Sequence, residues 1–312
     1  MKFKILLPLF VSFTFAISCS KVHFSDVPSE ACASAAQCVS NPSGETITYH
    51  VAPVAPNNKV DILIIDDNSV SMLQKQQNLA AHFPGFIQSL GNLDWRIAIA
   101  TTDNTALDTN NAQINALPQY MKDHKNANLV PFLVRNGSGY TRTNQYYIDR
   151  NTSNAQTMFA DTIQRPESLY CAQHPELRQM CFSLISGDER GIFSAIRNIN
   201  GSNPHNFLRS DAQLHVIFIS DEDERSNGGG YQNMAMVHGQ DYAQDLINTI
   251  GGRHAKIHSI VNLPGGYTPG GNFDYDNCVA NQIHDLSHEQ YSGCNYIQAS
   301  VQTSGVVENI GN

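Results

Sequence analysis

Two short apolar runs, each followed at once by acidic and hydroxyl residues, dominate the hydrophobic pattern of this chain. The first run extends from Val60 to Ile65 and the second from Leu214 to Ile219, and both are rich in β-branched residues. A parallel strand that is covered on both faces has this composition. After the first run, apolar residues recur at helical spacing from Met72 to Leu90, which predicts a helix that packs back on the strand.

Further runs continue this alternation along the chain. Apolar runs at 97–102 and 256–261 predict two more buried strands, and helical spacing predicts helices at 189–199, 242–250 and 296–302, the last of them before a short final strand. Strands that alternate with helices build a parallel sheet. We therefore expect an α/β fold with a doubly wound, mostly parallel central sheet and helices on both of its faces.

The segment 103–188 is long for a connection and rich in Asn, Gly and Thr. It predicts an insertion after the second strand, with strands at 129–134 and 146–149 and a helix at 155–163. Long irregular segments within a compact domain are often functional.

The amino terminus has the pattern of an export signal. Lys2 and Lys4 precede an apolar run at 5–15, which is too short to span a bilayer as a mature helix but is typical of a signal peptide. The sequence Ala-Ile-Ser-Cys at 16–19 resembles a bacterial lipobox. This resemblance implies a signal peptide at 1–18, lipidation of Cys19 and, with Ser20 next, the outer membrane of a bacterial cell envelope. A plain secretory signal is the alternative.

Residues 19–58 predict a flexible tether that carries a small disulfide loop, and 59–312 predict one folded domain. Apart from Cys19, the cysteines fall into local pairs. In an exported protein such cysteines form disulfides, and pairing between neighbours is the simplest of several possible connectivities. The expected bonds are Cys32–Cys38, Cys171–Cys181 and Cys278–Cys294.

The charge balance excludes one class of partner. The net charge is -9, and the sequence contains no cluster of Lys and Arg that could neutralise a phosphate backbone. Nucleic acid is therefore not expected to bind.

The polar residues that follow the first apolar run carry a family resemblance. Asp67, Ser69 and Ser71 form the pattern D-x-S-x-S directly after VDILII. This pattern resembles the metal-ion-dependent adhesion site (MIDAS) of von Willebrand factor type A (VWA) domains. The resemblance implies that these three residues hold a divalent cation, usually Mg²⁺. Taken without context, the same residues also fit a polar turn with a helix N-cap.

A second acidic group extends the resemblance to a two-part site. The sequence ISDEDE at 219–224 follows the second apolar run and is similar to a bacterial lipoprotein branch of the family. The resemblance covers residues 59–310 and implies that Asp221 completes the metal site.

The sequence departs from the family pattern at two positions of the expected site. The Thr that the family supplies before the helix at 189–199 is missing, and Ser186 or Asp188 would replace it; Thr101 and Thr102 are less favoured sources. Val70 stands where Gly is usual. The closing helix of the family is short or absent at the carboxyl end.

Carboxylate and hydroxyl oxygens are hard ligands, which favours Mg²⁺, with Ca²⁺ or Mn²⁺ as alternatives. The resemblance implies a non-enzymatic binding module for adhesion or complex assembly, whose protein partner presents an acidic residue to the ion.

Two other functions remain open. A metal-assisted hydrolase would use the ion to activate water, although the sequence has no recognisable nucleophile or base motif. A metal-free scaffold of an envelope complex would need no ion.

Overall fold

The computed structural model describes residues 58–185, 189–201, 204–224, 242–251, 253–280 and 292–311, together with two short strands nearer the amino terminus. The chain divides into two units, Met1–Pro56 and Asn57–Asn312. In the first unit, β1 (Cys38–Val39) pairs antiparallel with β2 (Thr48–Tyr49). Cys19, Cys32 and the side chain of Cys38 lie outside the described residues, so the lipidation site and the first expected disulfide stay predictions.

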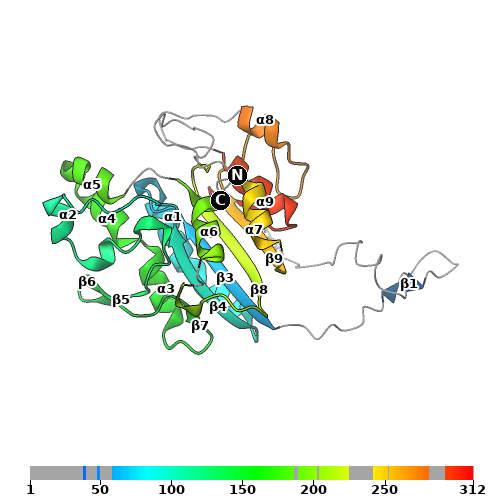
Figure 1. Ribbon diagram of the computed structural model, residues 1–312, viewed down its shortest axis with the longest axis horizontal. Helices are drawn as coiled ribbons and strands as arrows, with labels where there is room; N and C mark the ends of the chain where they lie inside the picture. The colour runs from blue at the N-terminus through cyan, green and yellow to red at the C-terminus, as the bar shows by residue number, and fades with distance from the viewer. Residues whose placement is uncertain are drawn as a thin grey trace, which may run out of the picture. The chain divides into compact units, whose positions relative to one another are not determined.

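A six-stranded sheet forms the centre of the second unit, in the order β10-β9-β8-β3-β4-β7 (Figure 1). Neighbouring strands are parallel, except that the edge strand β7 is antiparallel to β4. Numbered along the chain, the strands run 3-2-1-4-5-6 across the sheet, which is the doubly wound order. The strands are β3 (Lys59–Asp66), β4 (Asp94–Thr101), β7 (Ile148–Asp149), β8 (Gln213–Ser220), β9 (Ala255–Val261) and β10 (Val307–Asn309).

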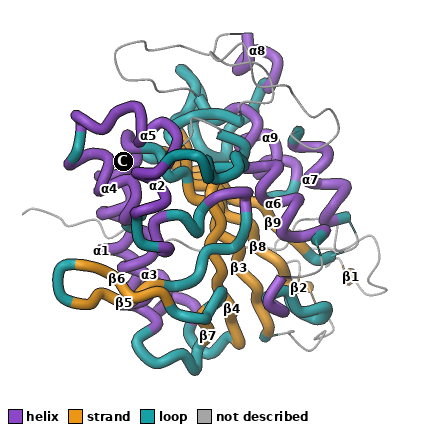
Figure 2. The backbone as a smooth tube through the Cα atoms, turned by 60° about the vertical axis from the view of Figure 1, so that its left-hand side comes forward, coloured by secondary structure: helices purple, strands orange, loops and turns teal. Residues whose placement is uncertain are grey.

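Helices cover both faces of this sheet, as the sequence pattern predicts (Figures 1 and 2). Leu63 and Ile65 of β3 face the layer of α6 (Gly191–Asn200), α7 (Ala243–Ile250) and α9 (Cys294–Gln302). Ile62 and Ile64 face the opposite layer of α1 (Leu73–Leu90) and α3 (Ala155–Ile163). Since β3 is buried on both sides, its run of apolar residues shows no alternation.

The segment expected to be an insertion contributes in part to the central sheet. Its strand β7 forms one edge of the sheet, and its helix α3 has the predicted bounds and packs on α1, where Phe159 stacks on Phe83. The remainder stands apart. A hairpin of β5 (Leu133–Asn136) and β6 (Gly139–Arg142) forms its own two-stranded sheet (Figure 2). The predicted strand at 129–134 is therefore displaced toward the carboxyl end, and only Leu129 makes an isolated bridge to β4.

Short helices and two disulfides complete the described structure. The helices are α2 (Ala112–Ala116), α4 (Pro166–Gln173), α5 (Arg178–Leu184) and α8 (Tyr275–Ala280), with 3₁₀ turns at Val70–Met72, Gln119–Met121, Lys125–Ala127, Pro175–Leu177 and Pro204–Asn206. The bonds Cys171–Cys181 and Cys278–Cys294 are present, which confirms two of the expected pairings. No helix in the described ranges is both long and apolar enough to cross a membrane.

Replacing Phe159 by Ala is expected to lower the free energy of unfolding by about 3–5 kcal/mol, because it leaves a cavity against Phe83 in the layer that covers β3. Denaturant unfolding measures this loss. Phe182→Ala is the matched control, since that ring is 56% exposed on α5 and its removal should change stability by less than about 0.5 kcal/mol. Equal losses in the two variants would contradict the assignment of Phe159 to the core.

Candidate metal centre

The register of the sheet brings the two polar groups to one edge. Asp66, the last residue of β3, lies opposite Thr101 of β4 and Ile219 of β8. The strands are parallel and end at the same level, so the residues after β3 and after β8 emerge side by side, and the backbone N–H of Asp67 donates to the carbonyl of Ile219 at 2.9 Å. This is the point where the strand order reverses, and doubly wound sheets bind ligands there.

Asp67 is fully buried and both of its carboxylate oxygens are engaged. Oδ1 accepts the backbone N–H of Ser69 at 2.8 Å, and Oδ2 accepts the hydroxyl of Ser220 at 2.9 Å. The first bond shapes the turn between β3 and α1, and the second joins this turn to the end of β8. Asp67 therefore ties together the two halves of the expected site.

The hydroxyl of Ser71 links the serine pair to the second half of the site. The Ser71 hydroxyl donates to Oδ1 of the buried Asp221 at 3.2 Å, and the two serine oxygens are 2.8 Å apart. Ser69 makes no side-chain capping bond, although it occupies the N-cap position of the 3₁₀ turn. The simple interpretation of these residues as a helix cap is therefore not supported; the Ser71 hydroxyl bonds to Asp221 and the Ser69 hydroxyl bonds to Ser71.

Burial and charge both act on the acidic groups of the site. Burial, and next the charge of Asp221, raise the pKa of Asp67 to about 6, against the opposing hydrogen bonds from Ser69 and Ser220. Burial also raises the pKa of Asp66 well above its usual range. Gln76 of α1 donates to Oδ2 of Asp66 at 3.2 Å and to the carbonyl of Asp67 at 2.8 Å, so Asp66 serves the packing of the strand end.

Lys75 is a member of the site that the motif does not include. Its Nζ lies 2.6 Å from Oδ2 of Asp221, and the lysine side chain is only 20% exposed. The D-x-S-x-S pattern gives no indication of Lys75, although the spacing of Lys75 in the sequence does. Lys75 follows Ser71 by four residues in a predicted helix, a spacing that places the two side chains on the same helix face.

Two other acidic residues of the 221–224 run, Asp223 and Glu224, hold neighbouring helices. Asp223 accepts the backbone N–H and the side-chain amide of Asn295 at 2.9 and 3.1 Å, at the start of α9. Glu224 accepts the backbone N–H of Ile192 at 2.6 Å, at the start of α6. Carboxylates at helix amino termini satisfy unpaired N–H groups and the helix dipole. Asp221, by contrast, accepts the hydroxyl of Ser71.

The loop that should supply the missing Thr is described only at its end. Ser186 and Asp188 lie outside the described residues, so neither is placed. Glu189 accepts the hydroxyl of Thr102 at 2.9 Å, and Thr101 donates its hydroxyl to the carbonyl of His124 at 2.9 Å. Both threonines thus donate to groups other than Asp67 and Asp221.

The chemistry of the oxygen donors indicates which kind of ion would suit the site. Two carboxylates and two hydroxyls are hard oxygen donors, and Ser69 and Ser71 are accessible to solvent while Asp67 and Asp221 are buried. Within the described ranges, no cluster of three or more His, Cys, Asp or Glu suited to a metal is found. By their chemistry alone, these oxygen donors would suit a hydrated hard cation of the Mg²⁺, Mn²⁺ or Ca²⁺ type better than Zn²⁺.

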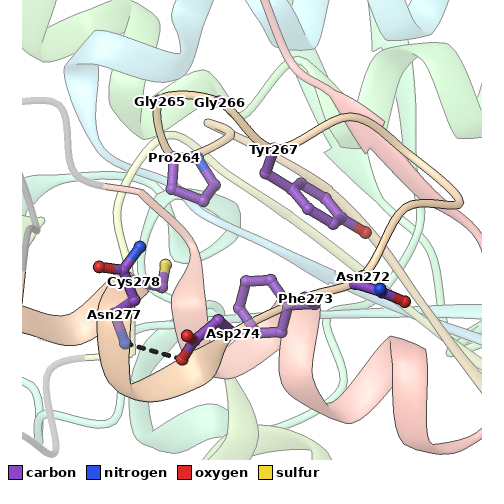
Figure 3. Close-up of a pocket in the computed structure, with 9 residues that line it drawn as sticks. All are labelled: Pro264, Gly265, Gly266, Tyr267, Asn272, Phe273, Asp274, Asn277 and Cys278. Carbon is purple, nitrogen blue, oxygen red and sulfur yellow. Dashed lines mark hydrogen bonds between the residues drawn. The ribbon is translucent and has the colours of Figure 1, made fainter.

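A pocket of about 430 Å³ lies in the loop that follows β9. The loop begins at Asn262, whose side chain donates to the carbonyl of Asp221 at 2.6 Å. Figure 3 shows the rings of Pro264, Tyr267 and Phe273 around the pocket, and the two aromatic rings meet edge to face at 5.3 Å. The amides of Asn272 and Asn277 and the carboxylate of Asp274 add polar groups to its lining.

Comparison with known proteins leaves the family open. No family model matches the chain, and neither does any curated protein. Among solved structures, the chain is similar to proximal thread matrix protein 1 of the mussel byssus, with a TM-score of 0.30 and 10% identity over 79% of this chain. The match spans 46% of that structure, and a similarity this low supports no conclusion about function.

The raised pKa of Asp67 predicts a pH dependence of stability. Between about pH 4 and 6 the folded chain holds a proton that the unfolded chain has released, so the free energy of unfolding should fall as the pH rises through this window. In chelator-treated buffer at pH 7, Asp67→Asn should be more stable than the wild type by about 1–3 kcal/mol. The two proteins should converge near pH 4. Urea unfolding across this range measures the slope, and an unchanged slope in the variant would contradict the assignment.

Proposed function

We propose that the chain is a cation-dependent binding module of the VWA class, anchored by lipid to a bacterial cell envelope. The observation that carries this proposal is the contact of Ser71 with Asp221, with Ser69 bonded to Ser71, at the switch point of a doubly wound sheet. The D-x-S-x-S pattern, the strand order and the position of Asp221 all agree with a MIDAS-type site. Ser186 or Asp188 is proposed as a further oxygen donor.

In this proposal Asp67, Ser69, Ser71 and Asp221 would hold a hydrated divalent ion, directly or through water, and Asp67 would also position the two loops. Asp67 acts through its bonds to Ser69 and Ser220, which fix both loops. When bound, the ion offers a Lewis-acid position to a carboxylate oxygen of a partner protein. Ser71 is exposed and Ser69 partly exposed, so this position would be open to solvent.

A binding role fits the contacts of the two serines better than a catalytic one. The Ser69 hydroxyl bonds to that of Ser71, and the Ser71 hydroxyl bonds to Asp221, whereas an activated serine nucleophile pairs with a base such as histidine.

Ser71→Ala is expected to weaken Mn²⁺ binding by about tenfold or more, because it removes one oxygen donor and the link to Asp221. Mn²⁺ binding can be followed by electron paramagnetic resonance of the free ion. Ser89→Ala, at an exposed serine of α1 that bonds only its own helix, is the control.

In envelope extracts, Mg²⁺-dependent capture of a protein partner should be lost in Asp67→Ala. Unchanged ion binding in both site variants would reject the proposal.

Cys19→Ser should convert an envelope-bound protein into one that is released in soluble form, because stable anchoring depends on the acyl chains. Fractionation and detergent phase partition of the two proteins measure this change. Retention of the variant in the membrane fraction would reject the lipid anchor and leave the metal site untouched.

A further inference from the structure

The ion pair between Lys75 and Asp221 is the strongest feature of the centre that the family resemblance does not account for. Lys75 extends from the first part of α1, and its Nζ lies 2.6 Å from Oδ2 of Asp221. The carboxylate is fully buried, while the lysine retains 20% of its exposure. Such a contact is short and only partly screened by solvent, so its effect on charge at the centre is large.

The two oxygens of Asp221 have different partners. Oδ1 accepts the hydroxyl of Ser71 and faces the serine pair, whereas Oδ2 accepts from Lys75. Lys75 therefore fixes the orientation of the carboxylate without occupying the oxygen that points to the serines. This division allows the ammonium group and an ion at the serines to share one carboxylate.

The charge balance gives this arrangement a functional consequence. Two carboxylates and a divalent ion would leave a neutral centre, to which a partner's carboxylate is drawn only weakly. With the ammonium of Lys75 in contact with Asp221, the same loaded centre has one positive charge more than it would have without the lysine. The ammonium also repels the ion, so it lowers the affinity for the ion while raising the attraction for an acidic ligand.

We infer that Lys75 sets the selectivity of this centre, trading affinity for the divalent ion against capture of a carboxylate ligand. The inference rests on the proposed function, because it requires that an ion binds at Ser69, Ser71 and Asp221. A merely structural ion pair would have a different effect. Its removal would leave the buried Asp221 unpaired and would lower stability without improving ion binding.

The test uses the intact chain with Lys75→Met, and Lys75→Gln as a second variant that keeps an N–H donor for Asp221. Dissociation constants for Mn²⁺ alone are measured by electron paramagnetic resonance. Both variants should bind Mn²⁺ about tenfold more tightly than the wild type, because the repulsion from the ammonium is gone. Lys75→Arg, which keeps the charge, should remain within about twofold of the wild type.

Lys59→Met is the matched control. Lys59 also pairs with an aspartate, Asp211, but it lies at the opposite end of β3, where both side chains are exposed. Removing its charge changes the net charge of the protein by the same amount. Its Mn²⁺ affinity should therefore remain that of the wild type.

A second measurement uses acetate as the carboxylate probe. Acetate that enters the open position displaces water from bound Mn²⁺, which lowers the water-proton relaxation rate. The Mn²⁺-loaded wild type should bind acetate at least several-fold more tightly than loaded Lys75→Met. Tighter ion binding together with weaker acetate binding is an outcome that a structural role alone would not produce.

The results separate the two proposals. If the wild type binds Mn²⁺ and Lys75→Gln binds it equally or more weakly, the role of Lys75 is rejected while the metal site stands. If neither the wild type nor any Lys75 variant binds Mn²⁺, the proposed function fails and the inference fails with it. Tighter Mn²⁺ binding without weaker acetate binding would reject the selectivity role.

Discussion

The pairing of β3 with β4 on one side and β8 on the other is the constraint on which the whole unit depends. β3 is buried on both faces, so each of its backbone groups needs a partner in a neighbouring strand and each of its side chains needs a layer of helices. A shift of register by one residue would exchange the two faces and misplace both apolar layers. The same register puts Asp66 level with Ile219, and so fixes where the polar residues emerge.

Acidic side chains concentrate at this edge of the sheet, and the structure neutralises them by three means. Asp67 receives an N–H and a hydroxyl, Asp223 and Glu224 receive N–H groups at the starts of α9 and α6, and Asp221 receives the ammonium of Lys75. Buried carboxylates are costly unless they are bonded or paired in this way. The raised pKa of Asp67 shows that the compensation there is incomplete, because burial and Asp221 outweigh its hydrogen bonds. A cation would relieve the remaining repulsion.

The long segment after β4 supports this edge from the side. Ser168 of α4 donates its hydroxyl to the carbonyl of Asn68 at 2.6 Å, inside the turn that carries the serines. Asp103 directly follows Thr102 and is paired with Lys125 at 2.8 Å. Burial opposes the ionisation of Asp103, but His124 and Lys125 outweigh it and hold its pKa well below the usual range. The connection between β4 and α6 thus supports the β3–α1 turn through a direct hydrogen bond.

The sequence alone indicated the core strands β3, β4, β8 and β9 and the helices α1, α3, α6, α7 and α9, because apolar periodicity reports local burial, but it did not indicate the short helices and the hairpin between β4 and α6. It also indicated the disulfides Cys171–Cys181 and Cys278–Cys294, since short loops favour neighbouring cysteines, and it placed Asp67 and Asp221 after buried strands. It did not reveal the edge strand β7 as part of the sheet, since two residues carry little periodicity. Only the tertiary structure decided that Ser71 meets Asp221, 150 residues away, and that Lys75 joins them. Strand order and side-chain partners across a sheet depend on burying both faces at once, and that is a property of the whole fold rather than of any one segment.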